Sequence, residues 1–489
     1  MTPSGKIYYH STQPLRTVAL AYLIDLGLMF LLLAAVMEGL RRTRHWGWWR
    51  LALAVLLPWL CVVLYPELVL AVLFAIVSKT PALIAVLVGL QYWIPLVLLV
   101  LWAAVLAGLR RFAPRVYGGV ITAGKVFAMG LGILGLIAIY HLGRAAVWKP
   151  ARSGVAAWHE RSGEQAAAHP RVVWIVFDEL SYAAVYEKPP AGVKFPSFER
   201  VGDTSYVYSD ARPVSYWTED ALPSLIRGKE TQKLKYRIDG TLRVYNRRDG
   251  WSDFNPAETV FGVAQRQGWN SGIVGWYNPY CSLLKDDVQG CYWAFRTNAC
   301  GTALASNTVW QNVKETWRFS DERLNQRLRE EHAEDRRDLL ARAGAMMGDE
   351  RYDFIFVHLP IPHPPNVYDG KTGKWRTGIG LSYADSLALA DRALGGFVTT
   401  LEQSPRWAKT TVVVQGDHSW RVPEWRGHPE WTAEDEALSH GGKFDDRPLL
   451  LVHVAGQTEG VRVAEPVPLL KAHDIVVSAI ENGRPLNVP

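Results

Sequence analysis

The chain has 489 residues, of which 49% are hydrophobic, so it is long enough for more than one domain. Lys and Arg number 53 and Asp and Glu number 47, and this formal net charge of +6 is too small to predict a nucleic-acid partner. The hydrophobic residues are concentrated before about residue 150, which predicts an apolar N-terminal domain followed by a domain of ordinary composition.

Four apolar stretches in the N-terminal part are long enough to cross a bilayer, which takes about 20 residues. They run approximately over residues 18–40, 51–77, 81–109 and 117–142. The second contains Pro58 and Pro66, so it is either one kinked helix or two shorter segments. The sequence therefore predicts a transmembrane domain over residues 1–147 with about four helices.

Arginines mark the first and third connections between these stretches, whereas the second connection offers only Lys79. They are Arg41, Arg42, Arg44 and Arg50 in the first connection and Arg110, Arg111 and Arg115 in the third. By the positive-inside rule these two connections are cytoplasmic, which places the N-terminus and everything after residue 142 outside. We therefore expect a multi-pass protein of the cytoplasmic (inner) membrane whose larger domain lies on the extracytoplasmic or periplasmic side.

Residues 148–170 are polar and rich in Ala and Gly, and we interpret them as a linker. From residue 171 to the C-terminus, stretches typical of strands alternate with stretches typical of helices. This alternation predicts an α/β domain over residues 171–489, with one main sheet covered by helices.

Three apolar runs in this domain each end in side chains that bind metals or transfer protons. The runs are RVVWIVFDE (171–179), DFIFVHLPIPH (353–363) and TTVVVQGDHSW (410–420). Runs of this kind are typical of strands buried on both faces, and ligands collect at the carboxyl ends of such strands. Because three strands deliver such side chains, we expect them to form one site.

The last run ends in Asp417 and His418. A carboxylate beside an imidazole, where the chain leaves the sheet, suits a divalent metal such as zinc or manganese. Taken alone, the pair also fits an ordinary turn from strand to loop.

Cysteine is sparse, and three of the four residues are close together in the larger domain. A disulfide is allowed outside the membrane, and Cys281 with Cys291 closing a short loop is the first choice, which leaves Cys300 over. The absence of a C-x-x-C pair disfavours a metal cluster of these thiols.

The stretch SYWTEDALPSLIRG (215–228) places Thr218 before an acidic first turn and a helical run. The simplest role for Thr218 is an N-cap that accepts a backbone N–H. A hydroxyl at a helix N-terminus also lies where N–H groups and the helix dipole favour anions, and a neighbouring metal would make it a nucleophile.

These fragments, taken in order over about residues 171–454, resemble the alkaline phosphatase and sulfatase superfamily. The resemblance is strongest to its membrane-bound branch of lipoteichoic acid synthases and phosphoethanolamine transferases. The matching fragments are Asp178 in VWIVFDELS, Thr218 with Pro223 five residues later, GWNSGIVGWYNPY (268–280), His363 in PIPHPP, YADSLALAD ending at Asp391, Asp417 with His418, and His440 before RPLLLV.

The resemblance implies an alkaline phosphatase-like α/β domain with a central, mostly parallel sheet flanked by helices, and one bound divalent metal. The implied ligands are Asp178, Thr218, Asp417 and His418. Zinc or manganese is expected, with magnesium and calcium as alternatives. The segment FDEL offers two carboxylates, so either Asp178 or Glu179 could be the ligand. The position of Asp178 favours it, and Glu179 would then contact a ligand without binding the metal itself.

The resemblance also implies that Thr218 attacks phosphorus and forms a covalent intermediate. His363 and His440 would bind the phosphate oxygens, or protonate the leaving group and activate the acceptor. His358 lies within its strand and lacks the proline frame of His363, so we interpret it as a packing or outer-shell residue.

The sequence departs from the sulfatases at the nucleophile. Their pattern, Cys or Ser followed two residues later by Pro and four residues later by Arg, is absent around Thr218, and threonine cannot become formylglycine. This departure favours phosphorus chemistry over sulfate ester hydrolysis.

The predicted function is the transfer of a phospho-substituted head group, of the phosphoglycerol or phosphoethanolamine type, from a lipid donor to a glycan or lipid acceptor. The first alternative is a sulfatase-like phosphodiesterase or hydrolase, with water as the acceptor. The second is a catalytically silent membrane scaffold, which would have no need of Thr218 with Asp417 and His418.

Overall fold

The computed structural model describes residues 15–42, 94–147, 156–190, 192–236, 241–294, 309–310, 313, 322–428, 430–486 and 488. The chain divides into two compact units, of which the larger parts are Tyr22–Gly143 and Arg144–Pro489.

The described N-terminal part is helical. Its helices are α2 (Leu15–Arg41), α6 (Ile94–Phe112) and α7 (Pro114–Val147). Over the part of the chain that the structure describes, no helix combines the length and the apolar character that a bilayer crossing requires. The second predicted span, 51–77, and residues 81–93 of the third lie outside the described residues, so the four-span domain stays a prediction.

The larger unit is built on an eight-stranded sheet in the order β14-β2-β13-β12-β1-β9-β7-β8. Its strands are β1 (Arg171–Phe177), β2 (Tyr206–Tyr208), β7 (Ser271–Trp276), β8 (Gly290–Ala294), β9 (Phe354–Leu359), β12 (Thr410–Gly416), β13 (Leu450–His453) and β14 (Val461–Val463). Only β13 runs antiparallel to its neighbours in this sheet. The predicted mostly parallel sheet is thus confirmed.

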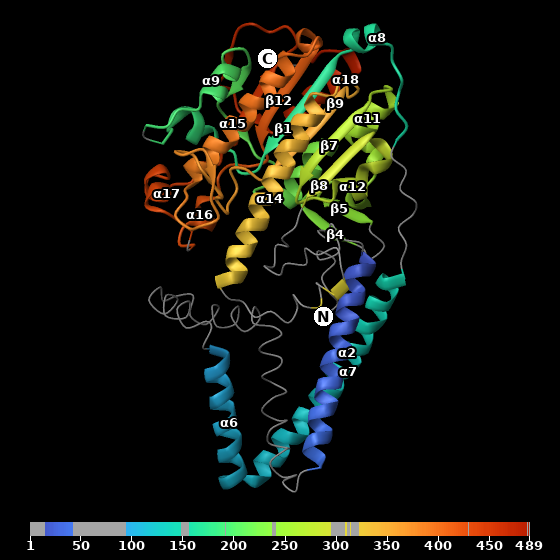
Figure 1. Ribbon diagram of the computed structural model, residues 1–489, viewed down its shortest axis with the longest axis vertical. Helices are drawn as coiled ribbons and strands as arrows, with labels where there is room; N and C mark the ends of the chain where they lie inside the picture. The colour runs from blue at the N-terminus through green and yellow to red at the C-terminus, as the bar shows by residue number, and fades with distance from the viewer. Residues whose placement is uncertain are drawn as a thin grey trace. The chain divides into compact units, whose positions relative to one another are not determined.

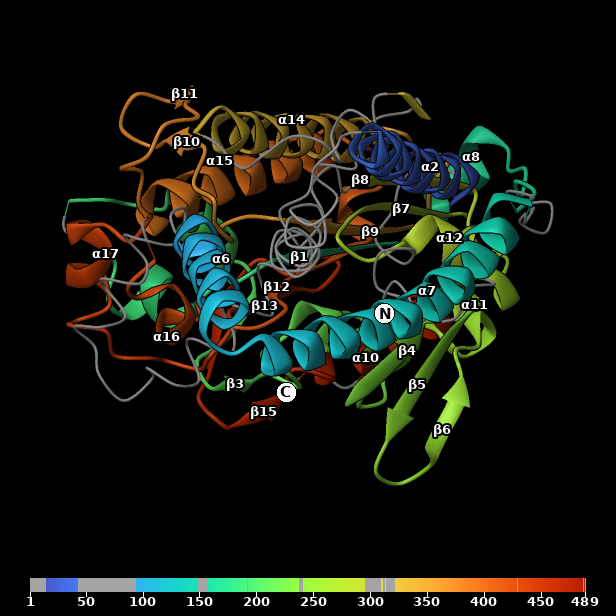
Figure 2. The same ribbon diagram turned by 90° about the horizontal axis from the view of Figure 1, so that it is seen from below.

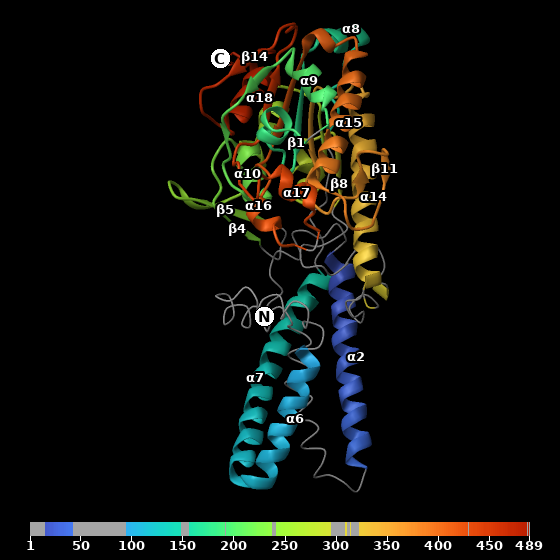
Figure 3. The same cartoon turned by 90° about the vertical axis from the view of Figure 1, so that its left-hand side faces the viewer.

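Helices cover both faces of this sheet, as Figures 1 and 3 show around the central strand β1. One face carries α9 (Pro196–Gly202), α14 (Glu322–Met347) and α15 (Tyr383–Glu402), and the other carries α10 (Thr218–Arg227), α11 (Val260–Arg266) and α18 (Lys471–Asn482).

The side chains of β1 alternate between these two layers. Val173 and Ile175 join the core under α14 and α15, whereas Val172 and Trp174 join the core under α10 and α18. A strand flanked on both faces is typically apolar, and every residue of β1 is buried, with Arg171 at its start as the one charged residue. The β-branched run that predicted this strand therefore reflects its central place in the sheet.

The register of the central strands brings their carboxyl ends to one edge. Phe177 at the end of β1 pairs with Gly416 on β12 and with Leu359 on β9. The residues that follow these three strands therefore leave the sheet side by side, which is where α/β proteins place their ligands.

Three further strands form a separate antiparallel ribbon, β4-β5-β6, with the bounds Lys233–Tyr236, Leu242–Asn246 and Gly250–Asp253. In Figures 2 and 3 this ribbon projects from the α/β layers. The two-stranded sheets are β10-β11 (Tyr368–Asp369 and Lys374–Trp375) and β15-β3 (Val467–Pro468 and Ala211–Arg212).

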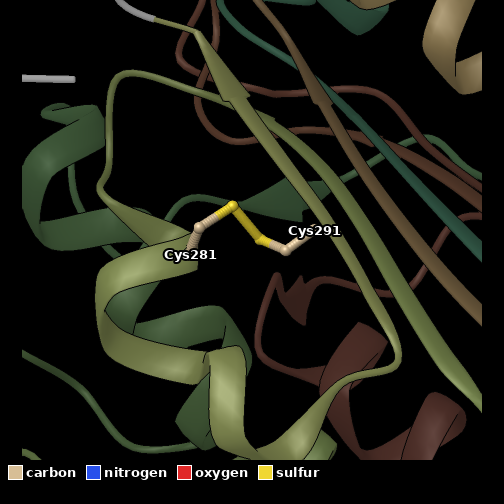
Figure 4. The surroundings of a disulfide bond; sticks show 2 residues. All are labelled: Cys281 and Cys291. Atoms are coloured by element: carbon tan, nitrogen blue, oxygen red, sulfur yellow. A yellow bond between two sulfur atoms is a disulfide. The ribbon is translucent and has the colours of Figure 1, made fainter. Parts of the chain in front are cut away.

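A disulfide joins Cys281 on α12 (Tyr280–Leu284) to Cys291 on β8, as Figure 4 shows. The predicted pairing is thus confirmed. Cys61 and Cys300 lie outside the described residues.

Candidate active site

Two adjacent strand ends bring Asp178, Asp417 and His418 together. Asp178 follows β1, and the other two follow β12 directly. All three side chains are fully buried, and each offers a ligand atom within 4.8 Å of the others. The Oδ1 of Asp417 accepts from the backbone N–H groups of Glu179 at 3.1 Å and of His418 at 2.8 Å, so its carboxylate is held in one orientation.

Gly416 allows this close approach of the two strand ends. A Cβ at this position would lie 2.6 Å from the carbonyl oxygen of Leu180 and 2.9 Å from that of His418, where no side chain fits. The glycine that ends the predicted strand is therefore a steric requirement of the site.

The donor set fits a divalent cation. The Nδ1–H of His418 donates to the Ser419 carbonyl at 3.0 Å, which leaves the Nε2 lone pair facing the Oδ2 of Asp417 at 3.3 Å. That oxygen is buried and has no hydrogen-bond partner. A histidine that donates its other ring N–H to a backbone carbonyl is the usual arrangement of a metal ligand.

The electrostatics of Asp178 agree with this interpretation. Burial raises the pKa of its carboxyl well above the usual range, and the neighbouring Asp417 and Glu179 raise it further. Two buried carboxylates at this separation can both be ionised only when a positive charge compensates them. Two carboxylates and one imidazole match the ligands that zinc and manganese accept.

Thr218 lies at the same place. It is the first residue of α10, and its Oγ1 is 3.4 Å from both carboxylate oxygens of Asp178 and 3.3 Å from the Nε2 of His418. The N-cap of α10 is Trp217, and no side chain caps this helix. The cap role that the sequence allowed for Thr218 is therefore wrong, because its hydroxyl faces the acidic cluster.

Glu179 is turned away from the cluster by its backbone. Its φ of 66° is left-handed, and its carboxylate accepts from the Nε of Arg421 at 2.6 Å and from the Nε1 of Trp425 at 3.0 Å. Between the two candidate ligands, the structure thus places Asp178 in the cluster and leaves Glu179 to hold a guanidinium.

Arg421 is a site residue that sequence reasoning missed. Its side chain is only 12% exposed, its guanidinium lies 5.2 Å from the centre of the Trp217 ring, and its Nη2 is 3.1 Å from the Nε2 of His363. The available signal was its place three residues after His418 in GDHSWR, in a loop that leaves the same strand end.

His363 follows β9, and its backbone N–H donates to the Asp178 carbonyl at 3.2 Å. Its Nδ1–H donates to the Pro364 carbonyl, so the Nε2 lone pair accepts from Arg421. Burial lowers the pKa of His363 well below the usual range, and the charges of Arg421 and Arg336 lower it further. Both ring nitrogens are thus engaged, so His363 orients the Arg421 guanidinium in this geometry, and its predicted roles in phosphate binding and proton transfer stay predictions.

The structure does not bring His440 to these residues. His440 follows α17 (Ala433–Leu438), and its side chain is exposed. Within the described residues it makes no hydrogen bond or ion pair to the side chains of Asp178, Thr218 or Asp417. The loop that carries it nevertheless reaches the nucleophile segment, because Phe444 packs against Tyr216 with ring centroids 5.7 Å apart.

His358 has the packing role that we expected. It is fully buried within β9, and its Nδ1 lies 3.0 Å from both the Trp276 carbonyl and the Tyr280 hydroxyl. Burial lowers its pKa to about 4. It is therefore a neutral imidazole beneath the site.

Comparison with solved structures finds several similar folds at low identity. The sulfatase PsFucS1 from Pseudoalteromonas sp. is 12% identical, with a TM-score of 0.44, covering 70% of this chain and 76% of that one. The phosphonate monoester hydrolase of Agrobacterium radiobacter is also 12% identical, with a TM-score of 0.40, covering 64% of this chain and 74% of that one.

No curated protein matches the chain. The family model described as Sulfatase matches residues 170–454, which is more than half of the sequence and includes every residue of the candidate site. The chain therefore belongs to the sulfatase family of enzymes.

Proposed function

We propose that this enzyme transfers a phospho-substituted head group, of the phosphoglycerol or phosphoethanolamine type, from a lipid donor to a glycan or lipid acceptor through Thr218. The observation that carries this proposal is the position of the Thr218 hydroxyl, 3.4 Å from the Asp178 carboxylate and 3.3 Å from the Nε2 of His418. A buried hydroxyl among acidic and imidazole groups is a candidate nucleophile.

Asp178, Asp417 and His418 would hold the divalent metal, with the Thr218 oxygen as a further ligand. When bound, such an ion lowers the pKa of a coordinated hydroxyl and neutralises charge on a phosphate. The chain's own contribution is orientation, because the backbone N–H groups of Glu179 and His418 fix the Asp417 carboxylate.

The first half-reaction forms a bond between the Thr218 oxygen and phosphorus and breaks the bond between phosphorus and the lipid alcohol. The lipid alcohol leaves with one proton, and Thr218 loses one. Arg421, held by Glu179, is placed to bind the non-bridging phosphate oxygens, since its guanidinium lies between Trp217 and His363.

In the second half-reaction the acceptor hydroxyl attacks the same phosphorus and Thr218 is released. The acceptor loses a proton and the Thr218 oxygen regains one, so the transfer is balanced. His363 supports this step through Arg421, because its Nε2 accepts from the guanidinium that would bind the phosphate oxygens and so helps to hold it in place.

A hydrolase of phosphate esters is the alternative, and membership of the sulfatase family favours it. It would use the same first half-reaction, with water as the acceptor. Sulfate ester hydrolysis by the sulfatase route is disfavoured, because Thr218 cannot become formylglycine.

A membrane location on the extracytoplasmic side is part of the proposal. It is supported by the apolar stretches of the first 147 residues, by the arginines in their first and third connections, and by the disulfide between Cys281 and Cys291. Disulfides persist mainly in oxidising compartments outside the cytoplasm.

The test is to incubate the full-length protein with micelles of phosphatidylglycerol or phosphatidylethanolamine and to measure its intact mass. The expected result is an added phospho-head group in the wild type and none in Thr218→Ala. Release of the free phospho-head group in the absence of any glycan or lipid acceptor would select the hydrolase. An unmodified wild type that still turns over the donor would exclude the covalent route.

A further inference from the structure

The ribbon β4-β5-β6 has an outward face that the proposed reaction does not use. Its register aligns two rows of side chains across the three strands. One row is Lys233, Tyr245 and Trp251, and the other is Lys235, Arg243 and Asp253.

The opposite face of the ribbon is its buried side. Leu242 and Val244 are 2% exposed and pack with Leu234, Phe254 and Leu283. Since side chains alternate along a strand, the rows of Lys233 and Lys235 must point the other way. The outward face is therefore held in place by its own small core.

Cations and aromatic rings are interleaved on this outward face. The Lys233 ammonium lies 5.7 Å from the centre of the Tyr245 ring, and the Arg243 guanidinium lies 5.9 Å from that of Trp251. Trp251 is 40% exposed, so part of its ring is open to a partner.

The charge of the described ribbon is unbalanced. Five cations, Lys233, Lys235, Arg243, Arg247 and Arg248, stand against two carboxylates, Asp249 and Asp253, a net charge of +3 (5 − 2). Of these, Arg243 is paired with Asp253 at 3.2 Å. A purely solvated face would need neither the excess of cations nor an exposed tryptophan.

We propose that this face docks on the surface of an anionic phospholipid bilayer. Clusters of Lys and Arg bind anionic head groups, and Trp and Tyr prefer the boundary between head groups and acyl chains. An acidic polymer would satisfy the cations but would give no reason for the tyrosine on the central strand and the tryptophan beside it on β6.

The position of the ribbon makes this docking relevant to the enzyme. β4 contacts α10, the helix that begins at Thr218. Docking of the ribbon would hold the nucleophile helix against the surface that contains a lipid donor. The inference itself does not depend on the reaction at Thr218, and its test has no catalytic readout.

The test is hydrogen exchange of the full-length protein with vesicles of phosphatidylcholine alone and with an equal mixture of phosphatidylcholine and phosphatidylglycerol. Peptides covering residues 233–253 should be protected only by the mixed vesicles. Each Lys or Arg near an anionic surface contributes roughly a fivefold increase in binding, so Lys233→Gln with Lys235→Gln should weaken the protection about 25-fold in lipid concentration.

The matched control neutralises Lys371 and Lys374, which lie in and beside the β10-β11 hairpin next to Trp375, and should leave the protection unchanged. Trp251→Ala should weaken protection by the mixed vesicles and leave the response to soluble polyphosphate as it is. Exchange of the inward-facing residues without vesicles reports whether each variant keeps the ribbon folded.

Three outcomes would overturn the proposal. Equal exchange of residues 233–253 with both kinds of vesicle would exclude an anionic-lipid face. So would equal protection in the wild type and in the Lys233→Gln, Lys235→Gln variant when its ribbon is folded. Protection by polyphosphate with none by mixed vesicles would instead assign the face to an acidic polymer.

Discussion

Replacement of Thr218 by alanine distinguishes a catalytic role of its hydroxyl from a structural role in α10. The hydroxyl lies 3.4 Å from the Asp178 carboxylate and 3.3 Å from the Nε2 of His418, and it caps no backbone N–H of α10. The variant should therefore lose activity without losing the helix.

The two magnitudes differ widely. Removal of a covalent nucleophile lowers turnover by roughly 10⁴-fold or more, which corresponds to about 5.5 kcal/mol of activation free energy. The contacts of Thr218 are long hydrogen bonds at the weak end of the usual range, and alanine is the better helix former. The free energy of unfolding should therefore change by less than about 1 kcal/mol.

Thr259 provides the matched control, because it is a true N-cap. Its side chain accepts from the Gly262 N–H at the start of α11, away from the acidic cluster. Thr259→Ala should cost about 1 kcal/mol of stability and leave turnover unchanged. Thr218→Ser keeps the hydroxyl and should retain measurable turnover.

The assay is head-group release from a lipid donor, with urea unfolding of the same preparations. The reasoning would be refuted if Thr218→Ala kept most of its turnover and lost stability as Thr259→Ala does. Thr218 would then have only a structural role.

Further predictions concern the metal, the disulfide, the pH dependence and the topology. Asp417→Asn should lower zinc affinity by roughly 100-fold or more, since a charged ligand is lost, and competition with a zinc-sensitive dye measures this; unchanged affinity would contradict the metal site. Replacing Cys281 and Cys291 by serine opens a loop with a sequence separation of 10 and should lower the free energy of unfolding by about 3 kcal/mol, which urea titration measures. His358 has a folded-state pKa of about 4, below the roughly 6.5 of an unfolded histidine. Its contribution to the free energy of unfolding is therefore complete above about pH 6.5 and is lost as the pH falls towards 4. That loss amounts to about 3 kcal/mol, and the unfolding free energy of His358→Gln should fall less than that of the wild type between about pH 7 and about pH 4. Reporter fusions at Thr43 and at the C-terminus should report opposite sides of the membrane, and identical reports would rule out the predicted topology.

The central strands were predictable because strands that are buried on both faces have mostly apolar sequences. The runs at 171–177 and 410–416 are apolar in their central positions, 172–177 and 412–414, and buried throughout, which is typical of strands covered on both faces. Their carboxyl ends carry Asp178, Asp417 and His418, and parallel strands bring such ends to one edge. The sequence therefore sufficed to predict the sheet, its ligand-bearing edge and the nearby disulfide of Cys281 and Cys291.

The roles of adjacent polar residues depended on the path of the backbone. Asp178 and Glu179 are neighbours in sequence, but the left-handed φ of Glu179 sends its carboxylate to Arg421 and leaves Asp178 facing His418. No periodicity in the sequence encodes that single dihedral angle.

Long-range packing determined which residues from distant parts of the chain meet in the candidate site. Thr218 and His418 are 200 residues apart, and the packing of α10 against the sheet brings the Thr218 hydroxyl to the imidazole, so the local pattern left the cap and the nucleophile both open. Arg421 became a site residue because its guanidinium reaches the carboxylate of Glu179, which follows β1, whereas His440, which the sequence grouped with the site, has an exposed side chain. Local sequence determines which strands form and what they carry at their ends, and tertiary contacts determine which of those groups meet, because the distances between them are set by elements that are far apart in the chain.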